Sequence, residues 1–117
     1  MPDWNELEFL SWKEFKQMGP SILQLEATRL EKLMRGAEDD LEAYNTYVKA
    51  RFELKKFISC LETAKSEKLP ESSLTHIRDA ISSLSHVRPK SHAPETVDYI
   101  LDRLNYIFHR SGLVYKN

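Results

Sequence analysis

The stretch LEAYNTYVKARFELKKFISCLETA, residues 41–64, lies in the longest part of the chain without glycine or proline. Apolar residues recur in it every three or four positions, in two series on different sides of a helix. The first series is Leu41, Tyr44, Val48 and Phe52, and the second is Tyr47, Ala50, Leu54, Phe57, Leu61 and Ala64. Acidic residues at 38–40 precede the stretch, where the positive end of a helix dipole favours them. The pattern predicts one unbroken central helix over about residues 39–65 that contacts neighbouring helices on more than one flank.

Glycine and proline divide the rest of the chain into further amphipathic segments. These segments predict helices over about residues 4–18, 22–35, 70–88 and 94–112. Gly19 and Pro20 are expected to separate the first two helices, and Gly112 to end the last. The helix near residue 70 begins either at Pro70 or at a nearby serine cap. The sequence therefore predicts an all-α, single-domain, up-and-down helical bundle of four to five helices over residues 1–117. Its last three helices, which have the clearest periodicity, are expected to form an antiparallel kernel.

The composition narrows the class of protein. Hydrophobic residues make up 41% of the 117 residues and charged residues 30%, which is too apolar for intrinsic disorder. No run of about 20 apolar residues predicts a membrane span, and the first residues do not resemble a secretory signal. Cys60 is the single cysteine, so no intrachain disulfide is possible. A cytoplasmic or other reducing intracellular location is expected.

Aromatic residues outside the predicted core stripes give the preferred functional hypothesis. Phe9 and Trp12 lie off the apolar stripe of the first predicted helix, and Val114 and Tyr115 follow the last one. Clustered exposed aromatic residues are typical of protein interfaces. These four residues are predicted to bind another protein or a second copy of the chain, as in a homodimer. The domain is then a non-enzymatic adaptor, regulatory or assembly subunit, with no cofactor expected.

The segment RLNYIFH, residues 103–109, supports an alternative in which the chain is an enzyme. Arg103 and His109 have five residues between them, and the pair resembles that of HEPN domains, a family of small all-helical ribonucleases. The resemblance implies that His109 transfers a proton from a ribose 2′-hydroxyl while Arg103 stabilises charge on the phosphate. In the preferred interpretation Arg103 is solvated and His109 interacts with the negative end of the helix dipole.

A second alternative is a nucleic-acid-associated subunit. Arg88 and Lys90 lie at the end of one predicted helix and in the loop after it, and Arg78 lies about two turns earlier on that helix. These cations could contact phosphates. The net charge of −1 gives no long-range attraction to nucleic acid, and this function is not favoured. No metal site is predicted, because the four histidines are scattered and the acidic residues near position 40 fit a solvated helix start.

Overall fold

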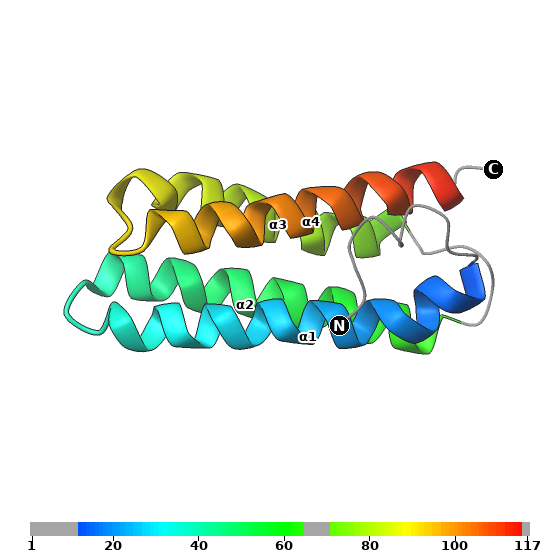
Figure 1. Ribbon diagram of the computed structural model, residues 1–117, viewed down its shortest axis with the longest axis horizontal. Coiled ribbons are helices and arrows are strands. Elements are labelled where there is room, and N and C mark those ends of the chain that lie inside the picture. Colours follow the sequence, from blue (N-terminus) through cyan, green and yellow to red (C-terminus); the bar gives the residue numbers. More distant parts are fainter. Residues whose placement is uncertain (1–11, 65–70, 116–117) are drawn as a thin grey trace.

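The computed structural model describes residues 12–64 and 71–115, and their side chains except at 12–15, 71 and 110–115. This part of the chain is helical throughout apart from short connections, and it contains no strand. Its elements are α1 (Trp12–Gly36), α2 (Leu41–Thr63), α3 (Glu71–Val87), the 3₁₀ helix η2 (Arg88–Lys90) and α4 (Pro94–Tyr115). The four α-helices run up and down beside one another (Figure 1). The prediction of an all-α up-and-down bundle is confirmed, with four helices in the described residues rather than five.

The order of packing differs from the predicted kernel. The most extensive contact joins α1 to α2, followed by α2 with α3 and then α3 with α4, while α1 and α4 close the bundle. A kernel of the last three helices alone is therefore wrong, because α1 supplies a full apolar face. The buried side chains from all four helices form one cluster, and its largest fully buried members are Tyr47, Phe57, Leu23, Leu30, Leu54, Ile58, Leu61, Ile77, Leu84 and Ile100.

Helix α2 confirms the predicted unbroken central helix. Asp40 is its N-cap, and its side chain accepts a hydrogen bond of 3.2 Å from the backbone N–H of Ala43. At the other end, Ala64 has an extended backbone, so the last carbonyls lack helical partners. The ammonium of Lys16 on α1 donates to the carbonyl of Ala64. A cation there also interacts favourably with the negative end of the α2 dipole.

The predicted break between two N-terminal helices is wrong, because α1 continues through Gly19 and Pro20. A proline inside a helix removes one hydrogen bond and costs about 3 kcal/mol. Both residues are buried, and Ile22 and Leu23 continue the same apolar face against the rest of the bundle. Burial of that continuous face at about 1.5–3 kcal/mol per large side chain outweighs the local cost. The first turns of α1, drawn in blue, run at an angle to the rest of the helix (Figure 1).

The predicted helix end at Gly112 is also wrong, since α4 extends to Tyr115. Gly112 is helical, so the left-handed turn expected of a glycine that ends a helix is absent. Glycine costs only about 1 kcal/mol relative to alanine inside a helix, so it permits an end without enforcing one.

The connection between α3 and α4 packs onto the ends of α1 and α2. The buried Tyr47 of α2 forms a hydrogen bond of 2.5 Å between its hydroxyl and that of Ser91. Its ring meets the imidazole of His92 edge-on, with centroids 6.3 Å apart. The same imidazole lies against Gly36, where a Cβ would come within 2.5 Å of Nε2. Gly36 is therefore the residue that lets the imidazole of His92 approach the end of α1 so closely.

Candidate functional site

An exposed apolar stripe on α2 is the most distinctive surface feature of the described residues. Leu41, Val48 and Phe52 are 71%, 36% and 55% exposed. Their spacing of seven and four residues places them on one side of the helix, away from the bundle core. The sequence predicts that the series Leu41, Tyr44, Val48 and Phe52 contacts a neighbouring helix. Only Tyr44, which packs partly against the core, fits that prediction, and for the other three it is wrong.

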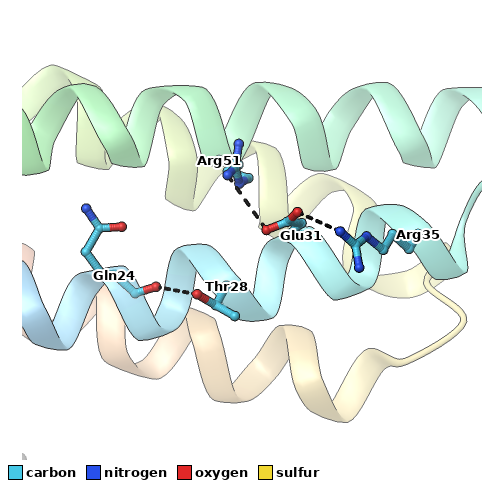
Figure 2. A network of polar contacts seen from close by, with 5 residues as sticks. All are labelled: Gln24, Thr28, Glu31, Arg35 and Arg51. Atoms are coloured by element: carbon cyan, nitrogen blue, oxygen red, sulfur yellow. Dashed lines mark hydrogen bonds and ion pairs between the residues drawn. The ribbon is translucent and has the colours of Figure 1, made fainter.

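Leu41, Val48 and Phe52 together are called the α2 stripe below. Polar contacts between α1 and α2 border one side of it. Glu31 accepts a hydrogen bond of 3.0 Å from Arg35 and forms an ion pair of 3.9 Å with Arg51 of α2. Figure 2 shows Glu31 between the two arginines, with Gln24 and Thr28 closer to the start of α1. An apolar centre with a polar rim is the usual anatomy of a protein interface.

The charge on the outer side of α2 changes sign along the helix. Glu42 lies near its start, and Lys49 and Lys56 follow at seven-residue intervals along the edge of α2 nearest α3. All three side chains are exposed. The ammonium of Lys56 lies over the Phe52 ring, 4.4 Å from its centroid, in a cation–π contact. The α2 stripe therefore has an acidic end and a basic end.

A buried carboxylate lies at the contact between α1 and α4. Glu26 is 1% exposed and accepts a hydrogen bond from Arg29, while its second oxygen has no hydrogen-bond partner among the described residues. Burial raises the pKa of Glu26, and the charges of Arg29 and Arg103 partly oppose that effect. The guanidinium carbons of Arg29 and Arg103 lie 4.6 and 3.9 Å from the centroid of the Tyr99 ring. This cluster links α1 to α4.

The two residues of the predicted HEPN-like pair lie on different faces of α4. Arg103 is half-buried at the contact with α1, and His109 is exposed. Because α4 is an unbroken helix, positions six apart differ by about 240° around its axis. The structure does not bring these two side chains together within one chain.

The three cations of the predicted nucleic-acid surface are all exposed, but Arg88 differs from the other two because it is held by a carboxylate. Arg88 donates two hydrogen bonds of 2.9 Å to the carboxylate of Asp98. These bonds lower the pKa of Asp98 and raise the pKa of Arg88. The bidentate pair neutralises Arg88 and ties η2 to α4. Arg78 on α3 and Lys90 in η2 are the exposed cations that remain.

The four residues of the predicted partner surface fall at or beyond the limits of the described chain. Phe9 lies outside the described residues. Trp12 begins α1, and Val114 and Tyr115 end α4, but their side chains are outside the described part. The start of α1 and the end of α4 lie at the same end of the bundle (Figure 1).

Other kinds of site find little support in the described residues. A shallow recess of about 500 Å³ between α2 and α3 is lined by polar side chains, among them Glu42, Lys49, Ser83 and His86. Binding pockets for small molecules are usually lined mainly by apolar side chains. In the described ranges, no group of three or more His, Cys, Asp or Glu residues could hold a metal ion. None of the described helices combines the length and apolar composition that crossing a membrane requires.

Comparison with known proteins adds no relative: no protein-family model, curated protein or solved structure matches this chain. The support for the candidate site therefore comes from the structure of this chain alone.

Proposed function

We propose that this chain is a non-enzymatic protein-binding module that acts as an adaptor, regulatory or assembly subunit. The observation that carries the proposal is the α2 stripe. Single exposed apolar residues are common on protein surfaces, but here three lie in one line along one helix. A helix of a partner that packs on such a strip buries its own residues spaced by three and four positions.

The site predicted from the aromatic residues is compatible with this function. Helix α1 begins at Trp12 and α4 ends with Val114 and Tyr115, and these two helix ends lie at the same end of the bundle. The Arg103–His109 pair gains no comparable support, because its two side chains lie on different faces of α4. The predicted nucleic-acid surface gains none either, because Arg88 is paired with Asp98.

The experiment is site-specific photo-crosslinking in cells of the natural source. Phe52 is replaced by p-benzoylphenylalanine, and a second variant carries the same group at Thr63, an exposed position at the end of α2. The proposal predicts discrete crosslinked products at position 52 that are absent or much weaker at position 63. Equal labelling at both positions, or no product at position 52, contradicts a binding role for the α2 stripe.

A further inference from the structure

We infer that the partner of the α2 stripe is a second copy of this chain, with the two α2 helices packed antiparallel around a two-fold axis. This inference rests on the proposed function and names its partner. In such a dimer the same surface is used by both copies, so the surface must complement itself when it is reversed in direction. The α2 stripe meets that requirement in charge and in shape.

The charges of α2 favour an antiparallel arrangement. Glu38, Asp39, Asp40 and Glu42 surround the start of the helix, and Lys55 and Lys56 lie in its second half, all of them exposed. Antiparallel packing brings the acidic start of one copy towards the lysines of the other. Parallel packing places like charges together, which is destabilising.

The position of the axis follows from the order of the apolar residues. With the two-fold axis beside Val48, the two Val48 side chains meet at the centre. Phe52 of one copy then faces Tyr44 of the other, because each lies four positions from Val48. In the same register Glu42 of one copy lies within about one helical turn of Lys56 of the other. Both of these residues are on the edge of α2 nearest α3, and a two-fold axis keeps that edge on the same side.

The extent of the surface sets the expected strength. Helix α2 spans Leu41–Thr63, and with the axis beside Val48 residues 41–55 of the two copies lie opposite one another, an overlap of about 22 Å at 1.5 Å per residue. A single helix pair buries less than the roughly 800 Å² per partner of a standard interface. The dimer is therefore expected to dissociate on dilution, in the micromolar range or above, rather than to be obligate.

The first test is sedimentation velocity over about a hundredfold range of protein concentration, spanning the micromolar range. The wild-type chain is expected to change from monomer to dimer as the concentration rises. Phe52→Ser removes a contact twice in each dimer and should raise the dissociation constant at least about tenfold. Leu25→Ser is the matched control, since Leu25 is 41% exposed on α1 rather than α2, and it should leave the dissociation constant unchanged. A chain that stays monomeric throughout, or a dimer weakened equally by both variants, overturns the inference.

The second test exchanges charges and is specific to the antiparallel arrangement. Glu42→Lys and Lys56→Glu should each raise the dissociation constant by about threefold or more at low salt. The double variant restores opposite charges across the two-fold axis and should recover most of the wild-type affinity. Additive weakening in the double variant overturns the arrangement. Circular dichroism melts should show that each variant remains folded, because all the changed side chains are exposed.

The crosslinking experiment separates this inference from the proposed function. Products with twice the mass of the chain, formed also by the purified protein, support both. A product with a different protein, together with a monomeric purified chain, supports the proposed function and overturns self-association. A crosslink within one chain, to residues 1–11 for example, overturns both.

Discussion

Substitution of Gly36 by alanine tests how the α3–α4 connection is held against the end of α1. No described glycine has a positive φ, so alanine suits the backbone at this position. Gly→Ala at a compatible site stabilises a protein by about 0.4–1 kcal/mol, chiefly through the entropy of the unfolded chain. The new Cβ, however, would lie 2.5 Å from Nε2 of His92, so the exposed imidazole must rotate away.

Rotation of that imidazole removes its edge-on contact with Tyr47. Aromatic pairs of this kind contribute about 0.5–1.5 kcal/mol. The gain from alanine and the loss of the contact therefore nearly cancel, and Gly36→Ala alone should change the free energy of unfolding by less than about 0.5 kcal/mol. In a His92→Ala background there is no ring to displace, and the same substitution should stabilise the fold by about 0.4–1 kcal/mol.

The measurement is a double-mutant cycle by urea denaturation, with the two single variants, the double variant and the wild type. The expected coupling energy between the two positions is about 0.5–1.5 kcal/mol. Additive effects within about 0.3 kcal/mol would show that the imidazole does not lie against Gly36 and would refute the reasoning.

Three further predictions concern the core, the buried acid and the Tyr47 hydroxyl. Leu54→Ala should lower the free energy of unfolding by about 2–5 kcal/mol, because Leu54 is fully buried, and the neighbouring Phe52→Ala by less than about 1 kcal/mol. Comparable losses in urea melts would contradict the orientation of α2. Burial raises the pKa of Glu26, so the folded state binds this proton more tightly than the unfolded state, and stability falls as the pH rises through the raised pKa. Glu26→Gln should lack this pH dependence. If the free energies of unfolding of the two proteins ran parallel between about pH 4 and 7, the raised pKa of Glu26 would be contradicted. Tyr47→Phe keeps the ring but loses the hydrogen bond to Ser91, and should cost about 0.5–1.5 kcal/mol by the same assay. An unchanged stability would mean that this bond makes no net contribution.

The sequence predicts the elements best where several local signals agree. Helix α2 has continuous periodicity, no glycine or proline, and a capping aspartate at Asp40, and its unbroken course is confirmed. The errors fall at Gly19, Pro20 and Gly112, where the local preference is to end a helix. Such preferences are worth about 1–3 kcal/mol, and tertiary burial of an adjoining apolar face can exceed them. That burial depends on the positions of the other helices, which a local pattern does not contain.

The candidate site is also only partly predictable from the sequence. The spacing of Leu41, Val48 and Phe52 is visible in the sequence, and it indicates an apolar line along the helix. Whether that line is covered depends on the angular positions of α1 and α3 around α2. Both neighbours pack towards the second apolar series, which leaves the first series on the outside. Periodicity therefore predicts the line, but only the assembled bundle identifies it as surface.

Pro20 has a consequence for the slow motions of the native chain. The carbonyl of Lys16 loses the amide partner that any other residue at position 20 would supply. Residues 12–19 are therefore joined to the remainder of α1 by an incomplete set of helical bonds, and the Lys16–Ala64 contact helps to fasten them to the bundle. We expect this segment to open as a separate cooperative unit, with amide protons that exchange with solvent faster than those of residues 22–33.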